Sequence, residues 1–199
     1  MVDSYLTIRE HSSSEIKINK SKFISQAFSL KSQLEIPILI KRVKKKHYDA
    51  SHHPYAFRVG MNKNSFRSSD DGEPSGSSGK PVFEAIDKYK LTDVLAVVTR
   101  YFGGIKLGVG GLRRAYFDGA EVCLQNAVII EKLITEKLNM EFDYKFMNVV
   151  MNLIEAGKII LLQNSSDEKC KLTLEVRLSK INKLKNDLTA LTNGSITIS

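Results

Sequence analysis

The 199-residue chain has no tryptophan, only four prolines and only two cysteines. Cys123 and Cys170 lie far apart, so their spacing fits neither a disulfide framework nor a zinc knuckle. Each cysteine falls in an apolar-patterned segment, where a thiol is usually buried and inert. We therefore expect two buried, reduced thiols.

Long apolar runs are missing as well. The longest ones, Val94–Val98 and Ile159–Leu162, are far too short to cross a bilayer. The N-terminus has no basic segment followed by an apolar one, which is the pattern of a secretory signal. The sequence therefore predicts a cytoplasmic protein without a membrane partner.

Positive charge is present in excess, and it is unevenly distributed. The net charge is +8; residues 1–133 hold 21 Lys and Arg against 14 Asp and Glu, and residues 134–199 hold 9 against 8. A local positive field attracts phosphate groups, so the excess fits a surface that faces a polyanion. Many moderately basic proteins bind no polyanion, and charge alone does not decide between the two readings.

Apolar periodicity predicts an α+β fold in two domains, 1–132 and 133–199. In the first domain, β-branched and aromatic residues at 4–10 and 14–30 indicate strands that pair as a hairpin. The strongest buried strand is expected at 93–102. The other predicted elements are strands at 55–60 and 65–68 joined by a turn at 61–64, and helices that begin after Ser32, at Pro81 and at Leu112.

The second domain has a pattern of its own. Strands are predicted at 134–142, 158–163, 170–178 and 194–198, and helices at 143–157 and 179–191. The order β-α-β-β-α-β is that of the ferredoxin-like fold. The segment QNSSDEK (163–169) supplies the turn between the two middle strands, and this domain has no cluster of catalytic residue types.

The segment DDGEPSGSSGKP, residues 70–81, has features of several kinds of site. Its end resembles a P-loop, but Pro74 and Pro81 replace the glycine and the hydroxyl residue that the motif needs. Ser77 and Lys80 have the S-x-x-K spacing of acyl-transfer serine enzymes. The glycine and proline beside them oppose the helix that this dyad requires. Neither reading holds.

The acids of the same segment allow two readings. Asp70, Asp71 and Glu73 suit a divalent cation, whereas Asp-Gly also favours a solvated tight turn. Nearby, His52 and His53 are adjacent on an extended stretch and point apart, so both cannot easily bind one metal. One of them can still act as a general base or donate to a phosphate. We expect no bound metal and no cofactor.

A glycine-rich loop at 100–114, RYFGGIKLGVGGLRR, leaves the predicted buried strand and enters a helix. That arrangement directs backbone N–H groups at an anion. The dinucleotide fingerprint G-x-G-x-x-G is not met, but four cations flank the glycines and can contact phosphate. The alternative is that the glycines only permit close packing while the cations are solvated.

Four stretches carry a resemblance to a known family: SKFISQAFSL, HYDASHHPYAFRVG, SSDDGEPSGSSGKPV and VVTRYFGGIKLGVGGLRRAY. Together they resemble the IMPACT family, including its bacterial YigZ-like members, over about residues 15–125. The resemblance implies a first domain with the βαβ fold of ribosomal small-subunit proteins and of domain IV of elongation factor G. It implies a ferredoxin-like second domain similar to domain V of that factor. The family brings no established catalytic activity.

The leading hypothesis is an RNA- or ribosome-associated protein that regulates translation and binds phosphate-rich partners through a glycine-rich basic cleft. Translation-related proteins are further expected partners, and the sequence does not define the oligomeric state. The predicted phosphate- and nucleic-acid-binding residues are Arg100, Tyr101, Lys106, Arg113, Arg114, Lys80, Tyr55, Lys44 and Lys45. The residues predicted to line the cleft are Asp70, Asp71, Glu73, Gly103, Gly104 and Gly108.

The alternative hypothesis is an uncharacterised enzyme that acts on a phosphorylated or nucleotide-like substrate. Glu73, Asp71 and His52 would then be the catalytic residues, as acid, base or metal ligand. This alternative requires a compact pocket in which the acids and Arg100 face each other.

Overall fold

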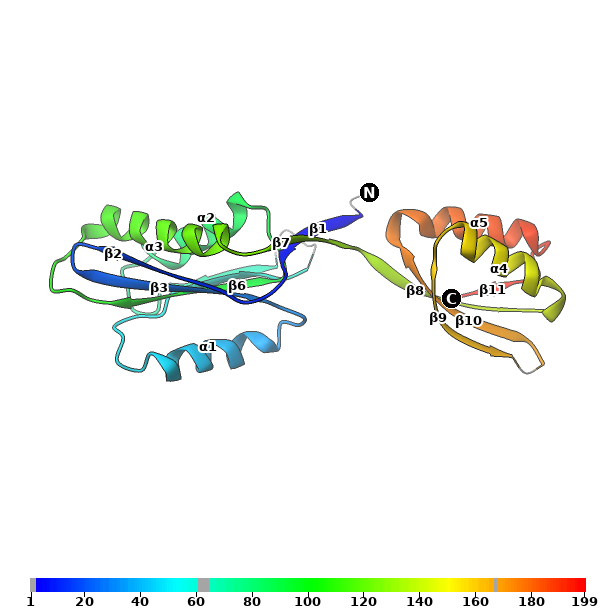
Figure 1. Ribbon diagram of the computed structural model, residues 1–199, viewed down its shortest axis with the longest axis horizontal. Coiled ribbons are helices and arrows are strands. Elements are labelled where there is room, and N and C mark those ends of the chain that lie inside the picture. Colours follow the sequence, from blue (N-terminus) through cyan, green and yellow to red (C-terminus); the bar gives the residue numbers. More distant parts are fainter. Residues whose placement is uncertain (1–2, 61–64, 167) are drawn as a thin grey trace. The chain divides into compact units, whose positions relative to one another are not determined.

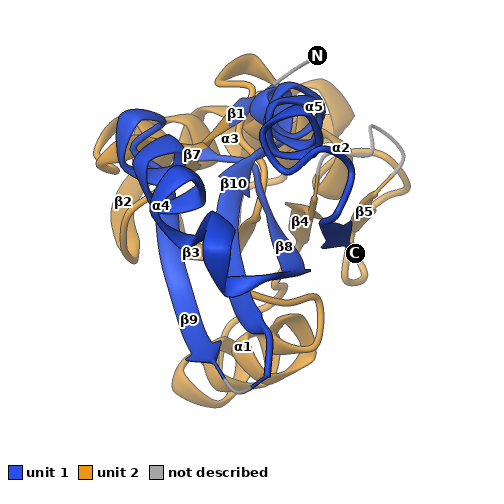
Figure 2. Cartoon of the chain, turned by 90° about the vertical axis from the view of Figure 1, so that its right-hand side faces the viewer, with its two compact units in different colours: residues 1–4, 133–199 blue, residues 5–132 orange. Residues whose placement is uncertain are grey.

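The computed structural model describes residues 3–60, 65–166 and 168–199. The chain forms two compact units (Figure 1, Figure 2). The larger comprises residues 5–132, and the smaller comprises residues 133–199 together with Asp3 and Ser4. Asp3 belongs to the smaller unit because its carbonyl accepts a hydrogen bond from the Ile134 N–H at 2.8 Å and its carboxylate accepts two from Ser179. Mixed α and β structure in two parts is confirmed.

A five-stranded antiparallel sheet forms the centre of the larger unit, in the order β2-β3-β6-β4-β5. Helix α1 covers one face, and helices α2 and α3 cover the other (Figure 1). A separate two-stranded sheet joins β1 to β7. The bounds are β1 Ser4–Ile8, β2 Ser12–Ile18, β3 Ser21–Ser29, α1 Glu35–Lys46, β4 Tyr55–Arg58, β5 Phe66–Ser69, α2 Gly79–Lys88, β6 Val94–Tyr101, α3 Gly108–Gln125 and β7 Ile129–Leu133.

Strand β6 connects two hydrophobic cores because its side chains alternate between the faces of the sheet. Val94, Ala96 and Val98 pack in the core under α2 and α3. Leu95 and Val97 pack in the core under α1. By the same alternation, the next side chain after Val98 on the α2–α3 face is that of Arg100, a charged group at the end of an apolar row. The fold thereby places one cation between sheet and helix.

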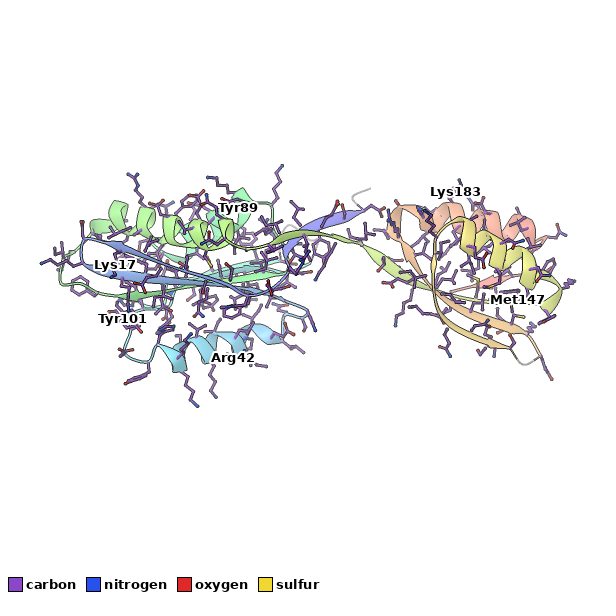
Figure 3. The ribbon with its side chains drawn as sticks, in the orientation of Figure 1. Lys17, Arg42, Tyr89, Tyr101, Met147 and Lys183 are labelled. Carbon is purple, nitrogen blue, oxygen red and sulfur yellow. The ribbon has the colours of Figure 1, made fainter. Side chains whose placement is uncertain are left out.

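The outer face of α1 is polar. Ile36 and Val43 are buried against the sheet, whereas Arg42 points away from it (Figure 3). An apolar stripe opposite a charged face is the expected pattern of a helix that covers a sheet.

Three details of the larger unit differ from the sequence predictions. The hairpin joins β2 to β3 through Asn19 and Lys20, both with positive φ, as a two-residue turn requires; β1 pairs instead with β7, a strand that was not predicted. Helix α3 begins at Gly108, so the second half of the predicted glycine loop is helical. Helix α2 begins at Gly79, two residues before Pro81. The predicted turn at 61–64 lies outside the described residues.

The smaller unit has a four-stranded sheet in the order β11-β8-β10-β9. Counted along the domain, this is fourth, first, third, second, with β10 antiparallel to both β8 and β9, so the predicted ferredoxin-like arrangement is confirmed. Strand β9 runs to Ser166, and residue 167 of the predicted turn is outside the described residues. The bounds are β8 Thr135–Phe142, α4 Met147–Ala156, β9 Ile160–Ser166, β10 Cys170–Arg177, α5 Ile181–Leu191 and β11 Thr197–Ile198.

Both cysteines are buried and free. Burial raises the pKa of the Cys123 thiol to about 11, so this thiol stays protonated at neutral pH. Within the described ranges, no helix has the length and apolar character needed to cross a membrane.

One glycine marks the closest approach between two loops of the larger unit. A Cβ at Gly103 would lie 2.1 Å from the backbone carbonyl of Lys20, whereas a Cβ at Gly110 would meet nothing within 4 Å. We expect Gly103→Ala to lower the free energy of unfolding by about 2–3 kcal/mol, because the backbone has to move. The control Gly110→Ala, in α3, should be neutral or stabilising by up to about 1 kcal/mol. Urea unfolding of both variants measures this; equal stabilities would contradict it.

Candidate functional site

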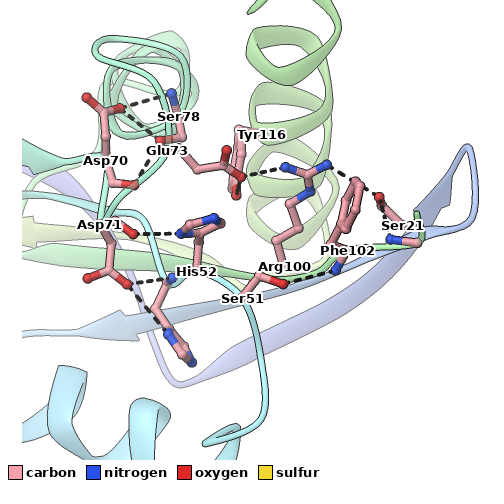
Figure 4. Close-up of polar contacts among 12 residues, drawn as sticks. Ser21, Ser51, His52, Asp70, Asp71, Glu73, Ser78, Arg100, Phe102 and Tyr116 are labelled. Atoms are coloured by element: carbon pink, nitrogen blue, oxygen red, sulfur yellow. Dashed lines mark hydrogen bonds and ion pairs between the residues drawn. The ribbon is translucent and has the colours of Figure 1, made fainter. Parts of the chain in front are cut away.

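A cleft of about 480 Å³ opens in the larger unit, at the C-terminal end of β6. Three segments line it: residues 51–52, residues 73–74, and residues between Arg100 and Leu112. The loop that precedes α2 and the glycine-rich loop that precedes α3 therefore both contribute to its lining. Figure 4 shows the polar contacts of residues from these three segments together with neighbours such as Asp71 and Tyr116.

Arg100 extends from the end of β6 under the cleft, and only 6% of its side chain is exposed. Its Nη1 donates to Glu73 Oε1 at 2.7 Å, and its Nη2 is 3.5 Å from Ser21 Oγ. The guanidinium carbon lies 5.6 Å from the ring centre of Phe23 and 5.3 Å from that of Phe102. Within the described part of the chain, the buried Nε has no hydrogen-bond partner. Arg100 is thus a buried, aromatic-flanked cation and not a free surface charge.

Glu73 provides the matching charge, and only 4% of its side chain is exposed. Its Oε1 also accepts a hydrogen bond from the Tyr116 hydroxyl at 2.7 Å, and Tyr116 itself is fully buried. Burial, and then the bond to the Glu73 carboxylate, raise the pKa of Tyr116 far above its ordinary value, so Tyr116 remains a hydrogen-bond donor. A buried carboxylate needs such partners because desolvation opposes its charge.

Asp70 is a structural residue of the loop rather than a lining residue of the cleft. Its Oδ1 accepts hydrogen bonds from the N–H groups of Ser78 and Gly79 and from the Ser78 hydroxyl, and its Oδ2 accepts one from the Gly76 N–H, at 2.7–3.0 Å. Burial opposes ionisation, but these donors outweigh it and hold the pKa of Asp70 below its usual value. This carboxylate fixes the loop and the start of α2.

Asp71 ties the same loop to α1 and to the two histidines. Its Oδ1 accepts from Lys44 Nζ at 2.6 Å, and its Oδ2 accepts from the His53 N–H at 2.8 Å. Burial is again outweighed, here by Lys44 and then His53, and the pKa of Asp71 is lowered. The Asp71 carbonyl lies 2.9 Å from His52 Nδ1. A carbonyl only accepts, so His52 Nδ1 carries the proton, and in the neutral ring Nε2 is an acceptor.

Of the other cations predicted to bind phosphate, only Lys106 lines the cleft. Arg113 donates to the Gly76 carbonyl at 2.8 Å and pairs with Glu84 at 3.1 Å. Arg114 is exposed and lies 3.6 Å from Asp118, one helical turn along α3. Lys80 is exposed on α2. These three cations do not converge on Arg100.

The remaining predicted residues, two tyrosines and two lysines, lie on the α1 side of the sheet. Tyr55 is half-buried against the core under α1. The Tyr101 hydroxyl bonds His47 Nδ1 at 3.0 Å and Asp49 Oδ1 at 3.2 Å, and Lys22 Nζ lies 4.5 Å from its ring centre. Lys44 is paired with Asp71, and Lys45 is exposed on α1. The sheet thus separates these residues from Arg100.

Of the predicted lining glycines, Gly108 lines the cleft, and all three serve backbone geometry. Gly104 and Gly108 have φ values of 85° and 69°, which favour glycine. Gly103 lies against the β2–β3 turn. Within the described residues no group of three His, Cys, Asp or Glu side chains is arranged to hold a metal.

Ser21, Ser51 and Val109 were not among the predicted site residues, although the last two line the cleft and Ser21 contacts Arg100. They lie in stretches that resemble the family, but their side chains carry no chemical signal of their own, and only the tertiary fold brings them together. Phe102 and Tyr116 lie in the same stretches, and no role was predicted for either.

Comparison with known proteins identifies the family. The Impact N-terminal domain matches residues 19–124, which include every segment that lines the cleft. The chain belongs to the IMPACT family. The predicted membership is thereby confirmed.

Relatives cover almost the whole chain. IMPACT family member YvyE of Bacillus subtilis is 35% identical over 194 residues, which is 98% of this chain and 89% of that protein. IMPACT family member YigZ of Escherichia coli is 31% identical over 186 residues, 90% of this chain and 89% of that protein. A crystal structure described as that of a hypothetical protein superposes with a TM-score of 0.73 at 25% identity, covering 100% of this chain and 97% of the other.

The buried ion pair generates a prediction about stability. Arg100→Met leaves Glu73 buried without its cation, so we expect the free energy of unfolding to fall by about 3–5 kcal/mol. Adding Glu73→Gln removes the stranded charge and keeps an acceptor for Tyr116, and this double variant should be more stable than Arg100→Met alone. Arg114→Met, which breaks an exposed pair, should cost at most about 1 kcal/mol. Urea unfolding is the measurement; a similar cost for Arg100→Met and Arg114→Met would refute the prediction.

Proposed function

We propose that this IMPACT family member binds RNA and acts at the ribosome in translation. The single observation that carries the proposal is the outer face of α1, a basic surface of four exposed side chains. They are Lys41, Arg42, Lys45 and Lys46. Across the described residues, none of the four forms an ion pair, so their charge is available to phosphates.

An exposed aromatic ring adjoins the same surface. Tyr48, two residues beyond the end of α1, is 86% exposed. Basic grooves that bind single-stranded nucleic acid combine cations with rings on which bases stack. Tyr48 suits stacking better than Tyr55, which is half-buried, or Tyr101, whose hydroxyl is bonded on two sides.

The link to translation has a different support. It rests on the resemblance of the two domains to domains IV and V of elongation factor G, which the sequence motifs imply. Sedimentation of ribosomes with the full chain tests it directly, because a ribosome-associated protein should appear in the ribosomal fractions at low salt and leave them at high salt.

Removing cations from α1 should change the salt dependence of RNA binding in a predictable way. Affinity for single strands falls with salt with a slope of about −0.7 per neutralised phosphate. We therefore expect Lys41→Ala with Lys45→Ala to reduce the slope of log K against log salt concentration by about 1.4. The measurement is fluorescence anisotropy with a labelled eight-nucleotide RNA.

The matched control removes the same charge elsewhere. Lys183 and Lys185 lie on α5 of the smaller unit, and Lys183 is visible there in Figure 3. Replacing both with alanine should leave the slope unchanged. Equal salt slopes in the two double variants would show that α1 does not contact the RNA. No RNA binding at any salt concentration would overturn the proposed function.

A second candidate function has its own observation. Glu73, Arg100 and His52 line one cleft, and Glu73 and Arg100 are in direct contact, as an enzyme acting on a phosphorylated or nucleotide-like substrate requires. His52 Nε2 would be the general base. Incubation with nucleotides, followed by chromatography, should then show product that His52→Ala fails to form. Absence of turnover by the unaltered protein would exclude this candidate for the substrates tested.

A further inference from the structure

The cleft above Arg100 is apolar on one side and polar on the other. Phe102, 49% exposed, and Val109, 55% exposed, contribute apolar surface beside Leu107. Together they give the cleft the mostly apolar lining that is common in ligand sites. They suit a flat, partly apolar ligand.

The polar side of the cleft offers hydrogen-bond acceptors. Arg100 and Tyr116 both donate to Oε1 of Glu73, and among the described residues no hydrogen bond to Oε2 is found. The Glu73 side chain is almost fully buried, and it lines the cleft. Arg100 and Tyr116 therefore orient a carboxylate that has one oxygen unused. Because Oε2 is not one of the fully buried atoms that have no partner among the described residues, a ligand donor can reach it and form a charge-assisted hydrogen bond.

His52 supplies a second acceptor in the same cleft. Its Nδ1–H is engaged by the Asp71 carbonyl, so Nε2 is the nitrogen with a free lone pair. Gly72 keeps the loop close to this ring, since a Cβ at Gly72 would lie 3.2 Å from His52 Nδ1. The ring is thus held by the same loop that carries Glu73.

One cation stands at the cleft without a protein partner. Lys106 lines the cleft and is exposed, and within the described ranges it forms no ion pair. It can therefore neutralise an anionic group of a ligand whose flat part enters the cleft.

From these features we infer that the cleft receives one unstacked guanine base of a single-stranded RNA, with Phe102 against the ring, Glu73 and His52 accepting from its N–H groups, and Lys106 near the phosphate. The inference rests on the proposed function, because it names the base that the RNA-binding protein selects. Sequence-specific recognition of RNA commonly uses bases that are splayed out, stacked on aromatic rings and read at their Watson–Crick edge.

Guanine fits the two acceptors better than the other bases do. Its Watson–Crick edge has two adjacent donors, N1–H and the N2 amino group. Adenine and cytosine each offer one amino group beside an acceptor nitrogen, and uracil offers one N–H between two carbonyls. An acceptor nitrogen or carbonyl of another base would be repelled by the Glu73 carboxylate. The preference for guanine therefore comes from this repulsion and from acceptors left unpaired with the other bases, as well as from the hydrogen bonds to guanine.

The ligand-side test needs no variant. The full chain is titrated at low salt with four labelled eight-nucleotide RNAs: all uridine, or uridine with a single central guanosine, adenosine or inosine. We expect the guanosine RNA to bind about tenfold more tightly than the adenosine RNA, the size of one good bidentate base contact. Inosine, which lacks the N2 amino group, should give an intermediate affinity.

The protein-side test replaces one atom. Glu73→Gln keeps an oxygen that accepts from Arg100 and Tyr116, and it puts an amide NH₂ where Oε2 was. The guanosine preference should disappear, because the amide NH₂ places a donor where guanine also presents donors. Glu84→Gln is the matched control, since Glu84 pairs with Arg113 and does not line the cleft, and it should retain the preference. Thermal unfolding shows whether each variant is folded. If Glu73→Gln does not fold, the ligand-side test on the unaltered chain decides.

The outcomes separate the two proposals. Equal affinity for the guanosine, adenosine and inosine RNAs overturns the inference, and if all-uridine binding then remains salt-dependent, the proposed function stands. If no RNA binds, titration with guanosine and adenosine monophosphates decides: a preference for the guanosine nucleotide supports the guanine site and rejects the RNA function, and no binding rejects both.

Discussion

The ion pair between Arg100 and Glu73 is the constraint on which the site depends. It joins the end of the central strand β6 to the loop before α2, and Tyr116 adds α3 to the same carboxylate. Since both charges are almost fully buried, neither can lose the other without a large cost. The pair therefore fixes the distance between the two loops that line the cleft, and the geometry of the cleft follows from it.

The three acids of the loop before α2 do different work because their partners differ. Asp70 accepts from backbone N–H groups of its own loop and stabilises the turn. Asp71 reaches Lys44 and His53 and joins the loop to α1. Only Glu73 lines the cleft. The carboxylates of Asp70 and Asp71 thus hold the loop before α2 in one conformation, and this conformation places Glu73 in the cleft.

The basic face of α1 and the cleft lie on opposite sides of one sheet, and a short segment connects them. The chain leaves α1 after Lys46, passes Tyr48, and reaches Ser51 and His52 at the cleft. The proposed RNA strand held by α1 would follow this segment past the C-terminal end of β6, where His52 pairs with Arg100. The proposed guanine site and the proposed phosphate surface are consistent with one continuous strand of RNA, because nucleic-acid affinity and base selection commonly reside in separate contacts.

Local sequence determined the fold class and much of the element order. Apolar periodicity identified β6 as a buried strand and gave the β-α-β-β-α-β order of the smaller unit, because both signals are local. The family motifs pointed to the loops of the cleft.

The pairing of β1 with β7, which are more than a hundred residues apart, has no local signal and required the tertiary structure. The same holds for the cations: seven were predicted as equivalent phosphate ligands, and only burial and partners distinguish them. Packing turned Arg100 inward onto Glu73 and Arg113 onto Glu84, and left Lys106 and the α1 lysines, other than Lys44, open to solvent. Residue types and spacing set what each group can do chemically. Which cation is free to bind a phosphate was decided by three-dimensional proximity, since a cation that is paired and desolvated is no longer available to a phosphate.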